Sequence, residues 1–135
     1  MRKSWAIVMP ALLAAAPVWA QQPLDLDTVD PAMLADFLGD WTILNADGSK
    51  SCKVTLSREQ TIGGMVIDID PVCGKVFPVM SDVASWRLLE DWEIVLADAT
   101  RKSLIRFTTP DNAYVAEPET DGISTIVKLG SALEN

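Results

Sequence analysis

The spacing of apolar positions changes near residue 40 of the chain. From Trp41 onward, apolar and polar positions alternate, and short runs of β-branched and aromatic residues lie between turn residues. The pattern predicts eight strands, over residues 41–44, 52–56, 65–69, 83–89, 92–97, 103–108, 113–116 and 124–129. Eight antiparallel strands with short connections can close into an up-and-down barrel, which leaves no open sheet edge. We therefore predict an all-β, eight-stranded antiparallel barrel. A two-sheet sandwich is the alternative, because strand number alone does not show closure.

Apolar residues with the spacing of a helix precede these strands. Asp30 can cap the amino terminus of a helix, and Pro31 fits its first turn. The apolar stripe of this helix consists of Met33, Leu34, Phe37 and Leu38. Gly39 then ends the helical spacing and frees the chain to turn into the first strand. The sequence thus predicts one short helix over residues 31–38.

The first twenty residues have the pattern of a secretory signal. Two basic residues, an apolar stretch and the small-x-small sequence Val18-Trp19-Ala20 follow one another. Two prolines interrupt the apolar stretch, and no cysteine follows it, so we expect neither a membrane-spanning anchor nor a lipid anchor. We expect cleavage after Ala20, with residues 21–30 left as an exposed arm and residues 31–135 as a single domain.

Charge and composition narrow the possible partners and chemistry. The chain has 11 basic and 19 acidic residues, a net charge of −8, and loss of two basic residues with the signal leaves −10. A chain this acidic repels nucleic acid and anionic membrane surfaces, so we expect neither as a partner. The absence of histidine removes Ser-His-Asp and Cys-His catalysis and most zinc chemistry. We therefore expect no enzyme, no cofactor and no resident metal.

Two groups of acidic residues are candidate sites. Asp25, Asp27 and Asp30 alternate with apolar residues and could touch a cation, but no glycine turn shapes them into a calcium loop. Asp68 and Asp70 share one face of a strand and could act as an acid and a base if one were buried. Both groups lie where a chain is usually solvated, and we interpret them as exposed acids.

The two cysteines and the segment after them form another feature. In an exported chain an even pair is most simply a disulfide, and one between Cys52 and Cys73 closes a loop of about 20 residues, for a stabilisation of about 3 kcal/mol. The segment Cys73–Met80 is too apolar for an ordinary loop. We expect it to fold across one mouth of the barrel.

Five aromatic residues of the predicted barrel have two interpretations. They are Trp41, Trp86, Trp92, Phe107 and Tyr114. Eight-stranded barrels can hold one small molecule, and aromatic residues often line such cavities. A domain of this size also needs these side chains to fill its core, and we favour this second interpretation.

The ordered set of these features resembles the bacterial alkaline proteinase inhibitor family, the periplasmic inhibitors of serralysin-type zinc metalloproteases, whose domain also occurs in envelope lipoproteins. The resemblance spans about residues 32–129. It rests on the signal, the short helix and the sequences LGDW (38–41), SCKVTL (51–56), VCGKVFP (72–78), DVASWRL (82–88) and IVLADATRKSLIRF (94–107).

The resemblance implies a monomeric periplasmic inhibitor: a barrel with a Cys52–Cys73 disulfide and an N-terminal arm that enters the cleft of a zinc metalloprotease. A free amino terminus can occupy the open coordination position of a catalytic zinc, and ten arm residues extend to about 30 Å. The implied protease-binding arm consists of Gln21, Gln22, Pro23, Leu24, Asp25 and Leu26, with Trp41 as a contact of the cleft rim. The alternatives are a structural envelope module without a protease target and a carrier of a small apolar ligand.

Overall fold

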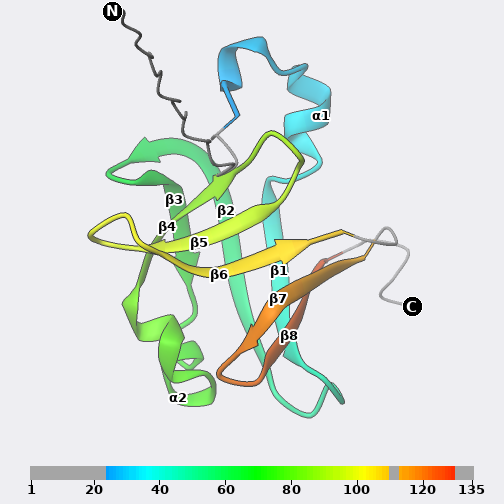
Figure 1. Cartoon of the computed structure of the whole chain (residues 1–135), viewed down its shortest axis with the longest axis vertical. Coiled ribbons are helices and arrows are strands. Elements are labelled where there is room, and N and C mark those ends of the chain that lie inside the picture. Colours follow the sequence, from blue (N-terminus) through cyan, green and yellow to red (C-terminus); the bar gives the residue numbers. More distant parts are fainter. Residues whose placement is uncertain (1–23, 110–112, 130–135) are drawn as a thin grey trace, which may run out of the picture.

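Eight antiparallel strands in sequence order form a closed barrel (Figure 1). The computed structural model describes residues 24–109 and 113–129, so the predicted signal peptide lies outside the described residues. The strands are β1 Gly39–Asn45, β2 Ser51–Thr61, β3 Gly64–Ile69, β4 Val83–Leu88, β5 Ile94–Asp98, β6 Ser103–Thr108, β7 Tyr114–Thr120 and β8 Ile123–Lys128. The first and last strands pair, with Trp41 opposite Lys128. This closure confirms the predicted barrel and excludes the sandwich.

The predicted helix is present but shorter than expected. Helix α1 comprises Pro31–Ala35, and the carboxylate of Asp30 caps it by accepting a hydrogen bond of 2.9 Å from the Ala32 N–H. The next three residues form a turn instead of a further helical turn, so the predicted end at residue 38 is wrong. Gly39 adopts a φ of +114° and begins β1. The helix ends early because Phe37 turns toward an aromatic partner on a distant loop, as described below.

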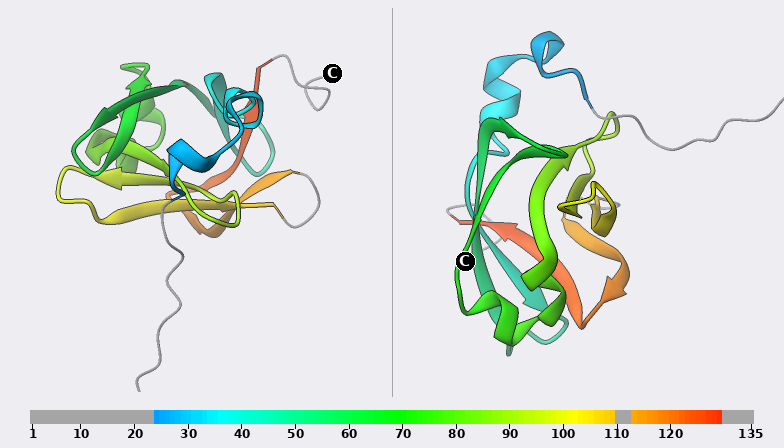
Figure 2. Two further views of the ribbon diagram at one scale, coloured as in Figure 1. Left: turned by 90° about the horizontal axis from the view of Figure 1, so that it is seen from above. Right: turned by 90° about the vertical axis from the view of Figure 1, so that its left-hand side faces the viewer.

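The two ends of the barrel differ. At one end lie residues 24–30, α1 and the β2–β3 and β4–β5 turns, and we call it the arm end (Figure 1). At the other lie helix α2, Cys73–Val76, the 3-10 helix η2, Pro78–Asp82, and the β1–β2 and β7–β8 turns. Figure 2 shows that residues 24–30, in blue, and α1 extend beyond the barrel instead of lying along its wall.

The predicted disulfide and the predicted covering segment are both confirmed. Cys52 in β2 is bonded to Cys73 at the start of α2, with the two Cα atoms 5.0 Å apart. Phe77 and Met80, which follow in the chain, are 0% and 2% exposed and belong to the core. The segment therefore closes the end of the barrel opposite the arm.

Side chains fill the interior of the barrel. Alternate residues point inward in strands such as β2, where Cys52, Val54 and Leu56 are buried, whereas β5 has four consecutive buried residues, 94–97. Trp86 and Phe107 are fully buried. This packing confirms that these two aromatic residues fill the core.

Strand β2 has a bulge, and a residue of this bulge is hydrogen-bonded to Trp86, the largest fully buried side chain. The register between β2 and β3 shifts between Leu56 and Gln60, so residues 57–59 have no paired residue in β3. The indole N–H of Trp86 donates a hydrogen bond of 3.0 Å to the Ser57 carbonyl. Trp86 also forms the single residue pair between β3 and β4, opposite Met65. One side chain thus joins the β2–β3 hairpin to β4.

Several strand boundaries differ from the prediction, most of them by one or two residues. Strand β2 continues to Thr61 and β7 to Thr120, because their polar ends extend beyond the core as solvated strand. Strand β5 begins at Ile94 and not at Trp92, which lies in the turn with a φ of +68°. Within the described ranges, no helix is long and apolar enough to cross a membrane.

Candidate functional site

The described part of the N-terminal arm is folded against the arm end of the barrel. The backbone N–H of Leu24 donates a hydrogen bond of 2.8 Å to the carbonyl of Leu88 at the end of β4. The 3-10 helix η1, Leu26–Thr28, follows, and Leu24, Leu26 and Val29 pack against the core. The arm is therefore folded over residues 24–29, where the sequence predicts an extended and exposed segment. Gln21, Gln22 and Pro23 lie outside the described residues.

Aromatic side chains pack against one another at the arm end of the barrel. Phe37 stacks on Trp92, with ring centroids 5.6 Å apart and planes inclined by 6°, and Tyr114 meets Phe37 edge-on at 6.2 Å. The Tyr114 hydroxyl donates a hydrogen bond of 3.0 Å to the Trp92 carbonyl. Burial raises the pKa of Tyr114, and the nearby charge of Asp91 raises it further, so the hydroxyl stays protonated as a donor. The cluster fixes the β4–β5 turn relative to α1.

Trp41 belongs to this cluster, but it is buried. Its indole N–H donates a hydrogen bond of 3.0 Å to the Phe37 carbonyl, and its ring meets Tyr114 at 5.7 Å. Because Trp41 is only 3% exposed, it offers almost no surface to a partner. Trp41 therefore packs beneath the surface of the arm end. The half-buried Trp92 is nearer the surface at this end.

Three of the four exposed large apolar side chains in the described residues lie at the arm end, and the fourth, Val72, precedes α2 at the other end. Ile62 at the tip of the β2–β3 turn is 67% exposed, Met33 of α1 is 47% exposed, and Leu129 after β8 is 38% exposed. The Leu129 N–H donates to the Asp40 carbonyl, which holds it beside the start of β1. Apolar surface left in water is a feature of interaction sites. The sequence pattern assigns Met33 to the apolar stripe of the helix and Leu129 to the last strand, so it does not indicate that they are exposed. Ile62 stands out in the sequence as an apolar residue beside the Gly63-Gly64 turn signal.

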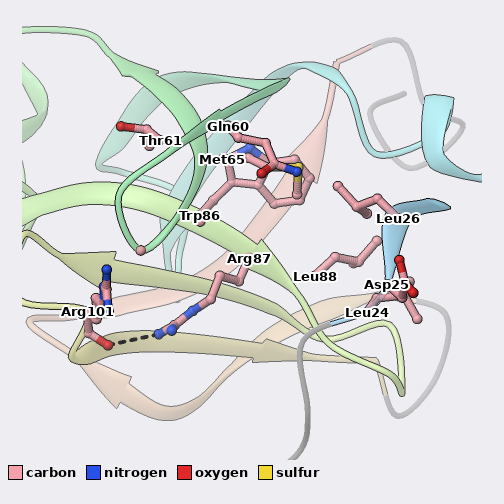
Figure 3. A pocket seen from close by; sticks show the side chains of 12 residues that line it. Leu24, Asp25, Leu26, Gln60, Thr61, Met65, Trp86, Arg87, Leu88 and Arg101 are labelled. Carbon is pink, nitrogen blue, oxygen red and sulfur yellow. Dashed lines mark hydrogen bonds between the residues drawn. The ribbon is translucent and has the colours of Figure 1, made fainter.

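A pocket of about 450 Å³ lies between the folded arm and the β2–β3 hairpin (Figure 3). Leu24, Leu26 and Leu88 form one side of it, and Met65 and Trp86 lie on the other. Arginine side chains from β4 and the β5–β6 turn border it, and Gln60 and Thr61 of β2 also line it. The pocket joins four segments that are distant in the sequence, so no local pattern predicts it.

The acidic candidates have structural roles. The carboxylate of Asp25 accepts a hydrogen bond from the Asp27 N–H and caps η1, as Asp30 caps α1. Asp70 accepts a hydrogen bond of 3.0 Å from the backbone N–H two residues on, and Asp68 is exposed. In residues 24–109 and 113–129, no three potential metal ligands lie together. These contacts confirm that both groups are solvent-exposed acids.

The family comparison agrees with this architecture. The family model of the protease inhibitor Inh matches residues 32–128, from α1 to the end of β8, and so confirms the resemblance seen in the sequence. No curated protein matches the chain. The chain therefore belongs to the Inh family of protease inhibitors.

Proposed function

We propose that this Inh-family protein acts in the periplasm on a secreted zinc metalloprotease of the serralysin type, and that its N-terminus enters the active-site cleft. The observation that carries the proposal is the attachment of the arm at Leu24, whose N–H binds the Leu88 carbonyl at the arm end. This contact attaches Leu24 at a fixed point on the arm end of the barrel. A pre-organised segment loses less conformational entropy on binding than a free one.

The chemistry of the proposed contact is metal coordination by an amine. A catalytic zinc keeps one position open for water, and a nitrogen lone pair can occupy it. An α-amino group has an ordinary pKa of about 7.7 to 8, so a fraction is unprotonated near neutral pH, and metal binding displaces the remaining protons. Cleavage after Ala20 would supply this amine on Gln21. An N-terminal glutamine can also cyclise to a lactam, which has no free amine.

The number of residues before Leu24 sets how closely the two proteins must approach. Only residues 21–23 precede the anchored Leu24 in the expected exported form, and three residues span at most about 10 Å. The zinc must therefore come within about 10 Å of Leu24, so the arm end of the barrel must rest on the rim of the cleft. The exposed side chains of Met33 and Ile62 are then placed to contact that rim.

Deletion of residues 21–23 tests the proposal without disturbing the barrel. The truncated form keeps Leu24, its hydrogen bond and its packing, so we expect an unchanged melting temperature. We expect inhibition of the zinc protease to weaken about 100-fold or more, because the amine no longer reaches the metal. The matched control is the double variant Gln21→Ser, Gln22→Ser, which keeps the length and a free amine that cannot cyclise and should inhibit fully. Equal inhibition by the truncated form would contradict insertion of the arm.

A further inference from the structure

Two arginines border the pocket between the arm and the β2–β3 hairpin (Figure 3). Arg87 comes from β4, and Arg101 comes from the β5–β6 turn, where it has a φ of +75°. The Nη2 atom of Arg87 donates to the Arg101 carbonyl and to the Ser103 hydroxyl, each at 3.2 Å. These contacts hold Arg87 in place but involve only neutral acceptors.

Neither arginine is paired with an acid in the described part of the chain. The one ion pair found there joins Arg106 Nε to Glu93 Oε1 at 3.0 Å and does not involve the pocket. The single acid that lines the pocket is Asp25, whose carboxylate already accepts the Asp27 N–H. In a chain with a net charge of −8, the pocket thus carries more positive than negative charge. Such a local reversal of sign favours an anionic partner.

Most of the remaining pocket wall is apolar or has no side chain, and Gln60 and Thr61 of β2 add two neutral polar groups. Leu26 and Met65 provide apolar surface. Gly63 has a φ of +88°, and a side chain at Gly64 would collide with the carbonyl of Trp86, so the hairpin approaches β4 with bare backbone. Apolar walls with a few polar groups at one edge are typical of sites that bind a ligand in a defined orientation.

We propose that this pocket receives an acidic side chain from the protease segment that borders the active-site cleft. Its carboxylate would lie between Arg87 and Arg101, and the apolar part of the same segment would pack on Leu26 and Met65. Arginine is well suited to this contact because its planar group binds carboxylates with two parallel hydrogen bonds. The inference rests on the proposed function and adds to it the chemistry of a second contact.

The geometry of the arm selects the protease as the occupant. Leu24 anchors the arm and also lines the pocket. A zinc within about 10 Å of Leu24 brings the surface beside the cleft over the pocket mouth. In the proposed complex the protease therefore covers the pocket. Because the two arginines of the pocket are not paired with an acid among the described residues, an acidic side chain of the protease is favoured there.

The test compares two neighbouring cations. Arg101 lines the pocket, whereas Lys102 follows it in the same turn and does not. We expect Arg101→Glu to weaken inhibition of the zinc protease about tenfold or more at low ionic strength, because a carboxylate would face a carboxylate. Lys102→Glu makes the same change in net charge and should alter inhibition less than about twofold. Unfolding curves of both variants check that the barrel is intact.

The possible outcomes separate this inference from the proposed function. A loss confined to Arg101→Glu, and smaller at about 300 mM salt, supports the pocket contact. Equal losses for the two variants would show a general effect of charge and overturn it, as would full inhibition by Arg101→Glu. If the wild-type protein itself fails to inhibit the zinc protease, the proposed function falls and the inference falls with it.

Discussion

Removal of the disulfide gives the stability prediction that can be worked furthest from the structure. The bond joins Cys52 and Cys73, which are 21 positions apart. In the chain-entropy account, a closed loop of this length stabilises the folded state by about 3 kcal/mol at 25 °C. Both residues are buried, so alanine is the least disruptive replacement. For a domain of about 100 residues, the double variant Cys52→Ala, Cys73→Ala should melt roughly 10 to 15 °C lower than the wild type.

The same variant separates stability from inhibition. The disulfide attaches α2 at the end of the barrel opposite the arm (Figure 1). A domain with an ordinary stability of about 5 to 15 kcal/mol stays folded after this loss, so inhibition at 25 °C should change less than about twofold. Thermal unfolding followed by circular dichroism measures the first quantity, and a reductant should lower the melting temperature of the wild type only. A loss below about 1 kcal/mol would refute the loop-entropy reasoning. If the folded variant no longer inhibited the protease, inhibition at the arm end would depend on the disulfide at the other end, contrary to the prediction.

Two further predictions concern side chains whose hydrogen bonds organise turns and hairpins. Trp86→Phe removes the donor to the half-buried Ser57 carbonyl and leaves a gap in the core where the larger indole was fully buried. It should lower the free energy of unfolding by about 2 kcal/mol, measured by urea denaturation. An unchanged denaturation midpoint would show that the bulge needs no such support. Asp98 accepts hydrogen bonds from the Thr100 hydroxyl and the Lys102 N–H, and these hold the pKa of its carboxyl below the ordinary value of 3.8. A lowered pKa stabilises the fold at pH values above the ordinary pKa, and this stabilisation is lost as the pH falls through the pKa of the folded state. The variant Asp98→Asn should therefore be less stable than the wild type at pH 7, and the difference in stability should shrink in acid. A margin independent of pH in parallel unfolding curves would contradict this assignment.

Much of the barrel could be predicted because alternation reports directly which face of a strand is buried. Cys52, Val54 and Leu56 recur at every second position and all face the core. The segment Cys73–Met80 was predicted to cover a barrel mouth from its apolar content alone, and burial of Phe77 confirms this. In each case the signal lies within a few consecutive residues.

Features that depend on distant partners could not be predicted. Helix α1 stops early because Phe37 stacks on Trp92, which is 55 positions away, and the same contact accompanies the left-handed turn at Trp92. The arm folds because Leu24 finds the carbonyl of Leu88 at the end of β4. Alternating leucine and aspartate residues give no local sign of that contact. The pocket and its arginines arise from the same long-range packing.

The inhibition constant of the exported protein against a serralysin-type zinc metalloprotease tests the central claim most directly. It should be measured twice, with the N-terminus identified by mass: once with a free amine on Gln21, and once after enzymatic cyclisation of that residue. We predict nanomolar inhibition by the free-amine form and a loss of about 100-fold or more on cyclisation, since the lactam cannot coordinate zinc. Equal inhibition by both forms would contradict coordination by the amine, and no inhibition by either form at micromolar concentration would contradict the proposed target.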